Sequence, residues 1–402
     1  MREIFNRGKS IRRFFVFFIL ETAALFLLFY DRKINTIDST MFAFSYKLGF
    51  ISRGFIGSVF TAVNKILPGD QYNYQGVMIF TQAFTALLFL FLFFFAYQCL
   101  KRVAKNQFSN TCYMLYFFQM FAVPMFVNSD NFGRLDLYLV LISLLSVFLL
   151  MNEKAEWLLV PLSAIAIMIH QGYAFMFYNI LLVLLLYKIL TKEKKEQKKY
   201  IAILISSLTV CVLLFFYFEF FAHATGLGVG ETVIQKAKML GDHGGYHKQV
   251  IEKEIMGLSI ANSEKEFRIY NAFEFPIFLV LILPYLMIGI RFFKGLVARA
   301  VDKKEKIVYL FVALGGFTIV PDLLLKCDFG RWMFAVVTYY SVVVLTLLAM
   351  GDKAVNQEIE VTFCRLKEHG VVAVFLFAYA FLFTPFRDTS ICNLTYQIAH
   401  FF

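Results

Sequence analysis

Residues 77–100 read VMIFTQAFTALLFLFLFFFAYQCL, a continuous apolar run with no charged residue. A helix rises about 1.5 Å per residue, so roughly 20 residues cross the ~30 Å hydrocarbon layer of a membrane. Residues 14–30 and 201–221 form similar runs. In lipid, only helices and closed barrels satisfy their backbone hydrogen bonds, and barrel strands would alternate in polarity over about ten residues. The runs therefore predict transmembrane helices.

The whole chain of 402 residues shares this composition. It is 60% hydrophobic and 17% charged, with a mean hydropathy of +0.68. A water-soluble domain cannot bury so large an apolar share, so we expect an all-α fold, a single polytopic transmembrane helical bundle over residues 1–402. The bundle is predicted to cross the membrane about eleven times, at residues 14–30, 77–98, 110–127, 135–151, 157–169, 173–190, 201–221, 273–290, 307–321, 332–349 and 371–385.

The positions of the basic residues predict the orientation. With the N-terminus in the cytoplasm, the inner segments carry about 24 Lys and Arg residues and the short outer ones about 4. Because short cytoplasmic loops are enriched in basic residues, the N-terminus is predicted inside and the C-terminus outside. The net charge of +11 then consists mostly of cytoplasmic anchors, and no nucleic-acid partner is expected. The first apolar run is too long for a cleaved signal peptide and is expected to be a retained helix.

Two predicted outer segments are long enough to carry a function. Segment 31–76 contains Arg53 and then, at residues 58–67, the apolar spacing of a helix that lies along the membrane surface. Segment 222–272 begins with glycines and reads as a mobile outer flap. It contains His243 and His247, but the sequence offers no further metal ligand, so we predict no metal and no cofactor and place both histidines with the substrate-binding residues.

A short motif occurs twice at predicted outer helix ends. Residues 131–134 read NFGR and residues 328–331 read DFGR, and each opens a crossing that runs inward. His170 stands at the same place before the crossing at 173–190. A helix N-terminus presents free N–H groups and a partial positive charge, and arginine adds donors that match phosphate oxygens. We therefore expect Arg134, Arg331 and His170 to form an anion site.

Acidic residues near these helix ends are candidates for a general base. They are Asp130, Asp136, Asp328 and Asp38. If a sugar hydroxyl attacks an anomeric carbon, a carboxylate or an imidazole must take its proton while cations hold the departing phosphate. His170 is the alternative proton acceptor.

Each of these residues also has a purely structural interpretation. Arginines at a membrane border commonly extend to lipid headgroups, which applies to Arg53, Arg134 and Arg331. A single histidine such as His170 often satisfies a local hydrogen bond. The repeated Phe-Gly-Arg motif favours function for the two arginines that share it, and both interpretations stay open for Arg53 and His170.

The stretch from NFGR at 131–134 to the histidine that ends AIAIMIH at 164–170 resembles polymerases of exopolysaccharides and O-antigens of the EpsG/Wzy type. The outer surface helix is similar to that of the wider GT-C class of membrane glycosyltransferases, which use polyprenyl-linked sugar donors. By this resemblance, Arg134, His170 and Arg331 would contact the donor diphosphate or catalyse transfer, with Gln171 beside them. The chain departs from the family pattern at Leu135, where glutamine is usual.

The resulting hypothesis is a membrane glycosyltransferase that joins polyprenyl-diphosphate-linked sugars or repeat units outside the cytoplasm, in the plasma membrane of a bacterium. Membrane lipids, lipid-linked glycans and other polysaccharide-assembly proteins are the expected partners. Two alternatives are a single-sugar GT-C transferase with a polyprenyl-phosphate donor and a flippase or transporter of the lipid-linked glycan. A transporter is expected to show inverted repeats and charges at mid-membrane depth, whereas the charges here lie at one face.

Overall fold

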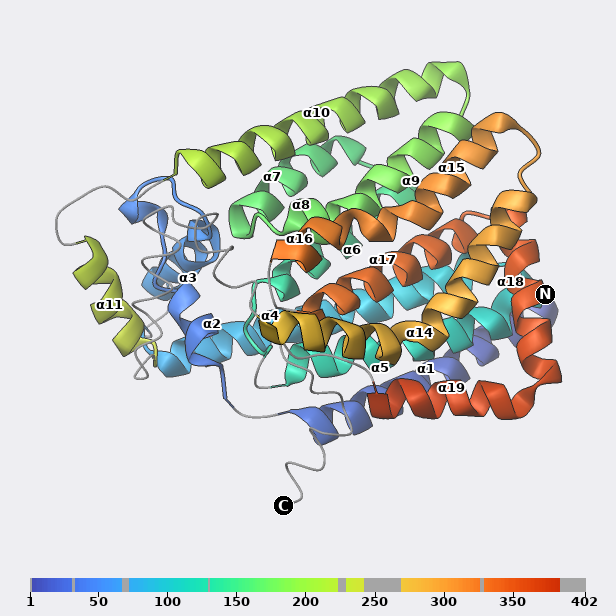
Figure 1. Cartoon of the computed structure of the whole chain (residues 1–402), viewed down its shortest axis with the longest axis horizontal. Coiled ribbons are helices and arrows are strands. Elements are labelled where there is room, and N and C mark those ends of the chain that lie inside the picture. The colour runs from blue at the N-terminus through green and yellow to red at the C-terminus, as the bar shows by residue number, and fades with distance from the viewer. Residues whose placement is uncertain are drawn as a thin grey trace.

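The computed structural model describes residues 2–30, 33–66, 72–128, 131–222, 229–241, 269–325 and 329–383, and every regular element in these ranges is a helix (Figure 1). The longer helices are α1 (Arg2–Phe29), α3 (Gly54–Ile66), α4 (Tyr74–Arg102), α5 (Phe108–Val127), α6 (Asp136–Asn152), α7 (Leu159–Ile169), α9 (Tyr178–Thr191), α10 (Lys194–Phe220), α11 (Val229–Met239), α14 (Ile269–Ala298), α15 (Lys303–Leu314), α17 (Phe329–Ala349), α18 (Lys353–Glu368) and α19 (Gly370–Phe383). The short ones are α2 (Thr36–Met41), η1 (Tyr46–Leu48), η2 (Lys105–Gln107), η3 (Glu156–Leu158), α8 (Tyr173–Met176), η4 (Gly315–Ile319) and α16 (Val320–Leu325). The predicted all-α class is confirmed.

Four helices of the described chain are long and apolar enough to cross a membrane: Tyr74–Arg102, Lys194–Phe220, Leu279–Ala298 and Gly330–Ala349. Several shorter apolar helices accompany them, among them Asp136–Asn152 and Tyr178–Thr191. A helix lies over each of the segments predicted to cross, although the number of crossings stays a prediction. The apolar helices are therefore compatible with a membrane protein.

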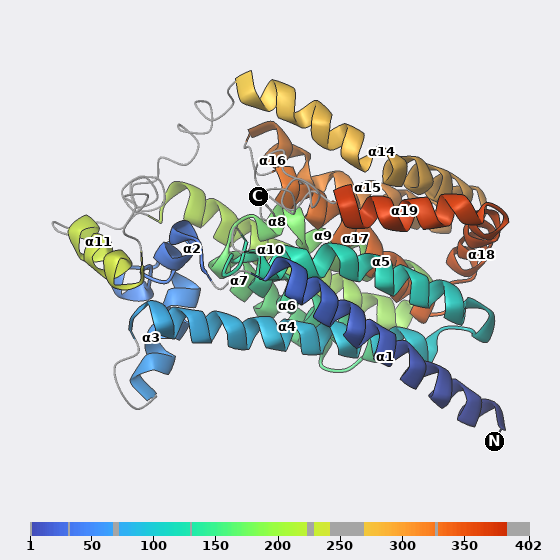
Figure 2. The same ribbon diagram turned by 90° about the horizontal axis from the view of Figure 1, so that it is seen from below.

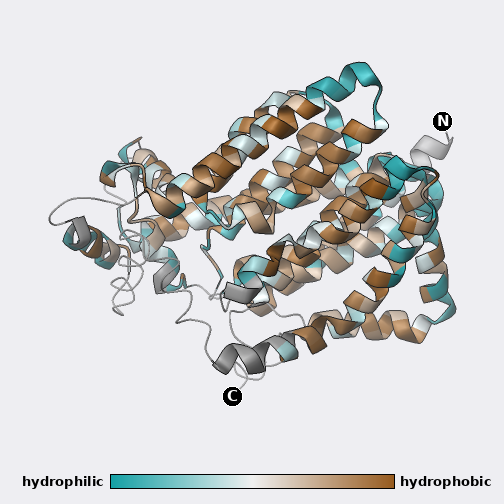
Figure 3. Ribbon diagram, turned by 45° about the horizontal axis from the view of Figure 1, so that its top comes forward, coloured by the Kyte–Doolittle hydropathy of each residue, from teal (hydrophilic) through white to brown (hydrophobic). Residues whose placement is uncertain are grey.

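The outward faces of the long helices are apolar. Leu27 on α1 is 81% exposed, and Leu213 on α10 and Val280 on α14 are each 64% exposed. Figure 3 shows the same pattern over the whole bundle, where hydrophobic residues dominate the helix bodies and hydrophilic ones gather at the helix ends. Contiguous apolar surface of this kind is unfavourable in water and favourable against lipid chains.

Most long helices run along the long axis of the molecule, so the bundle has two ends (Figure 1, Figure 2). We name the end that carries α2, α3 and α11 the α3 end, and the end that carries α18 and the N-terminus the α18 end. Helix α3 covers the stretch where a surface helix was predicted. In the predicted flap at 222–272, the structure describes α11 and the start of α14.

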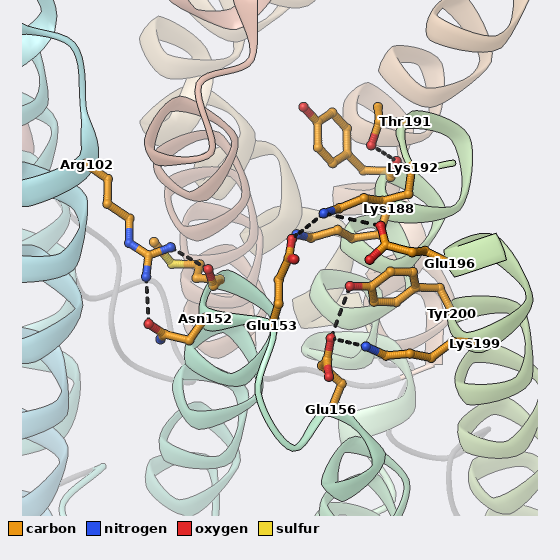
Figure 4. A network of polar contacts seen from close by, with 12 residues as sticks. Arg102, Asn152, Glu153, Glu156, Lys188, Thr191, Lys192, Glu196, Lys199 and Tyr200 are labelled. Atoms are coloured by element: carbon orange, nitrogen blue, oxygen red, sulfur yellow. Dashed lines mark hydrogen bonds and ion pairs between the residues drawn. The ribbon is translucent and has the colours of Figure 1, made fainter. Parts of the chain in front are cut away.

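Ion pairs join the loops at the α18 end (Figure 4). Glu153, which follows α6 in the left-handed conformation at φ 54°, accepts from Lys188 Nζ at 2.5 Å and lies 2.7 Å from Lys192 Nζ. Hydrogen bonds from these two lysines lower the pKa of Glu153 to about 2. The Glu156 carboxylate accepts a hydrogen bond from Lys199 Nζ at 2.7 Å. These contacts hold the ends of α6, α9 and α10 together.

Two broken helices pack against each other inside the bundle. One is interrupted at Phe177, between α8 and α9, and the other changes where α15 gives way to the 3-10 turn η4. The Asn179 amide donates to Gly315 O at 2.8 Å and to Thr318 Oγ1 at 2.9 Å. The Tyr340 hydroxyl donates to Ala313 O at 2.7 Å. Side chains thus satisfy carbonyl groups that a continuous helix would pair, as an apolar environment requires.

These breaks shorten two of the predicted crossings. The crossing expected at 173–190 is interrupted at Phe177, and in the one expected at 307–321 the 3-10 turn η4 separates α15 from α16. The inner segment expected at 351–370 also forms a helix, α18, because the Asp352 carboxylate accepts from Val355 N at 2.8 Å as an N-cap.

Candidate functional site

The first Phe-Gly-Arg sequence forms a turn that enters α6. Gly133 adopts φ +96°, a conformation that glycine takes without strain. A Cβ atom there would lie 3.1 Å from Ile34 Cγ2 and 3.7 Å from Asp38 Cβ, so glycine lets the turn approach the segment around α2. The backbone N–H of Arg134 donates to Asn131 O at 3.1 Å. This local fold directs the next residue, Arg134, toward α2.

Arg134 and Asp38 form a buried ion pair. Arg134 Nε lies 3.8 Å from Asp38 Oδ2, and their side chains are 10% and 9% exposed. This distance permits a Coulombic attraction but is too long for a hydrogen bond. Asp38 of α2 therefore lies beside the turn that enters α6. Tyr138 lies one turn further along α6.

Arg331 and Asp136 form a bidentate ion pair that is shorter than the Arg134–Asp38 pair. Arg331 Nε donates to Asp136 Oδ2 at 2.6 Å, and Arg331 Nη2 donates to Asp136 Oδ1 at 3.0 Å. The Asp136 side chain is 0% exposed and that of Arg331 is 12% exposed. Because Asp136 opens α6 and Arg331 lies in the first turn of α17, this contact holds two helix N-termini side by side. The helix N-termini that follow or contain the two Phe-Gly-Arg sequences therefore lie side by side.

His170 ends α7 with its ring oriented by the following turn. It is 8% exposed, and its Nδ1 accepts a hydrogen bond from Gly172 N at 2.8 Å. A backbone N–H can only donate, so in this geometry Nδ1 carries no proton and the neutral ring carries its hydrogen on Nε2. A Cβ atom on Gly172 would lie 3.0 Å from the His170 ring, so glycine at that position accommodates the imidazole.

Gln171 links three elements at the α3 end. Its Oε1 accepts from Ser52 Oγ at 2.8 Å, and its Nε2 donates to Glu219 Oε2 at 3.4 Å. Ser52 precedes α3 and Glu219 lies in the last turn of α10. The turn after His170 is thus tied to the segment that contains Arg53.

Arg53 occupies a strained backbone position at the start of α3. Its φ is +60°, which is uncommon for a residue with a side chain. Arg53 Nη1 contacts Met41 Sδ at 3.9 Å, which brings the guanidinium to the end of α2. Such strain persists where the surrounding packing enforces it, and it concentrates at functional segments.

The structure therefore joins several of the predicted residues through two ion pairs and one hydrogen bond. Asp38 pairs with Arg134, Asp136 pairs with Arg331, and Gln171 connects to the residue before Arg53. Four other predicted residues, Asp130, Asp328, His243 and His247, lie outside the described residues. Among the described residues, no group of three or more His, Cys, Asp or Glu side chains is arranged for a metal ion.

The sequence analysis missed Ser52, Glu219 and Tyr138. Ser52 adjoins Arg53, which is the only sequence signal that could have pointed to it. Glu219 is an acid inside the apolar run at 201–221, which could have pointed to it. Nothing in the sequence distinguishes Tyr138 from the other tyrosines in apolar segments.

Comparison with protein families gives one match. Residues 57–241 match the family described as Domain of unknown function (DUF6311). The matched region runs from α3 to the end of α11 and includes Arg134, Asp136 and His170, whereas Asp38 and Arg331 lie outside it. Neither a curated protein nor a solved structure matches the chain.

Proposed function

We propose that the α3 end binds a polyprenyl-diphosphate-linked sugar and transfers the glycan to an acceptor hydroxyl. The observation that carries this proposal is the contact between the two helix N-termini, where the bidentate Arg331–Asp136 pair lies two residues from the Arg134–Asp38 pair. Adjacent helix N-termini with arginine donors favour a multiply charged anion. A lipid diphosphate is such an anion at the border of a membrane.

The geometry suggests different roles for the two arginines. Arg331 is fixed by two short hydrogen bonds, and Asp136 acts as its positioning partner. Arg134 Nε lies 3.8 Å from the Asp38 carboxylate. Replacing this contact by one to a donor phosphate therefore costs less free energy than breaking the Arg331–Asp136 pair. We assign the diphosphate to Arg134, with Arg331 supporting it.

The proton balance favours Asp38 as the base. The acceptor hydroxyl oxygen attacks the anomeric carbon, the bond from that carbon to the diphosphate oxygen breaks, and the hydroxyl proton passes to a carboxylate. Asp38 lies beside Arg134, so its carboxylate would be close to the acceptor hydroxyl when Arg134 binds the phosphate. His170 Nδ1 accepts from Gly172 N, so the ring is set to donate from Nε2 rather than to take a proton. We therefore assign His170 to the departing diphosphate.

The finer features of the topology belong to the same proposal. We place the α3 end outside the cytoplasm and the α18 end inside, with about eleven crossings and a GT-C-like arrangement in the plasma membrane of a bacterium. The lysines of the α18 end support this orientation, because basic residues favour the cytoplasmic side. Polysaccharide-assembly proteins would be the partners.

One observation favours a second function, transport of the lipid-linked glycan. The broken helices α8–α9 and α15–η4 are typical of transporters, which bind substrates at such breaks. In this chain, however, Asn179 and Tyr340 use their polar groups on the carbonyls of the break. The transferase is therefore preferred, with a single-sugar transferase as the alternative within enzymes.

Complementation of a strain that lacks the chain tests the proposal. Variants Arg134→Ala, His170→Ala and Arg331→Lys are expected to shorten or abolish the ladder of surface polysaccharide, because the first two remove a donor to the diphosphate and the third removes the two-bond contact that supports the site. Lys195→Ala, at the α18 end, is the matched control and should leave the ladder unchanged. Membrane insertion of each variant is checked by immunoblot. Normal ladders in all three inserted variants would contradict the proposal.

A further inference from the structure

A hollow with two lysines among its lining residues lies at the α3 end between η1 and α3. Its volume is about 320 Å³, within the range of small-molecule sites. Its lining residues are Ser45, Tyr46, Lys47, Ser58, Thr61, Ala62 and Lys65. None of these residues belongs to the Arg134 and Arg331 pairs described above, so the hollow is a separate feature of this end.

Close backbone packing gives this hollow a fixed shape. A Cβ atom on Gly57 would lie 1.9 Å from Phe44 O, so glycine lets α3 rest directly on the chain that leads to η1. The Tyr46 backbone N–H donates to Ser58 Oγ at 2.8 Å. Ser58 Oγ in turn donates to Gly54 O at 2.6 Å. These contacts therefore fix the position of η1 against α3, which together form the hollow.

The hydroxyl groups and the lysines that line the hollow differ in whether their hydrogen-bond donors are already used. The hydroxyl protons of Ser58 and Thr61 are used on the backbone of α3, at 2.6 Å and 2.7 Å. The charged residues that line the hollow are Lys47 and Lys65, and each carries an ammonium donor. A site with two ammonium donors recognises an anion rather than a neutral sugar.

A third lysine adds to the positive charge of the hollow. Burial and the nearby charge of Lys47 lower the pKa of Lys236 on α11. Within the described part of the chain, no carboxylate forms an ion pair with Lys47, Lys65 or Lys236. Like charges held close together without an acid raise the free energy of the folded chain, and a bound anion would lower it.

We propose that this hollow binds a phosphate group through Lys47 and Lys65, with Lys236 adding to the attraction. The phosphate has two sources at a membrane border, the headgroup of an anionic phospholipid or a soluble phosphate compound. The site binds the same chemical group in both cases. The inference holds whether or not the α3 end transfers sugars, because it concerns a different set of residues and is read out as binding.

The test compares Lys47→Gln/Lys65→Gln with Lys238→Gln. Lys238 is an exposed lysine of α11 that does not line the hollow, so its variant removes positive charge at the same end as a matched control. Purified chains in a neutral detergent are titrated with inorganic phosphate by calorimetry. They are then placed in nanodiscs of phosphatidylcholine with or without phosphatidylglycerol, and retained lipid is counted by native mass spectrometry. Thermal unfolding confirms that each variant is folded.

Saturable binding of either probe by the wild type is expected, with at least about tenfold weaker binding by the double variant and an unchanged affinity for Lys238→Gln. Binding of inorganic phosphate would identify a soluble source, and selective retention of phosphatidylglycerol would identify the headgroup. The proposal is overturned if the wild type binds neither probe. It is also overturned if the double variant binds like the wild type, or if Lys238→Gln loses as much affinity as the double variant.

Discussion

Arg331, at the start of α17, contacts Asp136, at the start of α6, through two hydrogen bonds of 2.6 Å and 3.0 Å across 195 positions of the chain. Asp136 is fully buried, so its charge depends on this guanidinium for compensation. The contact fixes the separation of two helix N-termini. It is therefore the structural basis for the anion site that we propose at the α3 end.

Replacing Asp136 by Asn is expected to destabilise the chain by roughly 2–4 kcal/mol, because Arg331 is then left almost buried without its countercharge. The measurement is thermal unfolding in detergent. A double variant, Asp136→Leu/Arg331→Leu, should recover part of the loss, since no unpaired charge remains. An Asp136→Asn chain as stable as the wild type would show that the pair contributes nothing.

Gly57→Ala is expected to destabilise the α3 end by roughly 1–3 kcal/mol, because the new methyl carbon would lie 1.9 Å from Phe44 O and 2.7 Å from Phe42 O. Denaturant unfolding followed by tryptophan and tyrosine fluorescence measures the change. Gly8→Ala is the matched control, because a Cβ atom at that position would meet nothing within 4 Å and alanine favours a helix. Equal stability of the two variants would refute the close contact between α3 and residues 42–44.

Asn179→Ala is expected to cost about 1–3 kcal/mol, since Gly315 O and Thr318 Oγ1 lose a donor inside the bundle. Tyr340→Phe removes one bond, to Ala313 O, and should cost less. Thr191→Ala at an exposed helix end serves as the control. Thermal unfolding ranks the three, and a ranking with the control most damaging would show that these side chains do not stabilise the break.

Glu153 predicts a pH dependence of stability at the α18 end. Its pKa is lowered from 4.5 to about 2 by Lys188 and Lys192, so its stabilising contribution is complete above pH 4.5 and is lost as the pH falls toward 2. The side chain is 39% exposed, so screening by water keeps the contribution to about 1 kcal/mol or less. Glu153→Gln should therefore flatten the loss of melting temperature between pH 5 and 2.

Glu196→Gln provides the control for that experiment. Glu196 is 49% exposed and meets Lys192 at 3.6 Å, so it is the weaker partner of the same lysine. Its variant should keep most of the acid dependence of the wild type. If both variants show the same pH profile, Glu153 is not the group that titrates.

The apolar runs of the sequence predict the positions of the long helices well, because a stretch such as 77–100 has no soluble alternative. The breaks are harder to predict, since the carbonyls at and before η4 are satisfied by Asn179, Tyr339 and Tyr340, which lie far from it in the sequence. Helix α18 could have been anticipated from its N-cap, Asp352.

The candidate site shows a similar division. The repeated Phe-Gly-Arg sequence predicts Arg134 and Arg331, and the structure places both at buried helix N-termini. Which acid each arginine meets could not be predicted, because a pairing across 195 positions depends on how the helices pack. The link from Ser52 to Gln171 depends on the approach of α3 to α7 and has no sequence signal.

The most direct test of the central claim is glycan transfer by the purified chain in proteoliposomes supplied with a polyprenyl-diphosphate-linked oligosaccharide. The account predicts longer lipid-linked products with the wild type, a loss of about 100-fold in rate for Arg134→Ala and Asp38→Asn, and no change for Lys195→Ala. Product formation by Arg134→Ala and Asp38→Asn at the wild-type rate would contradict the claim that the α3 end performs the transfer.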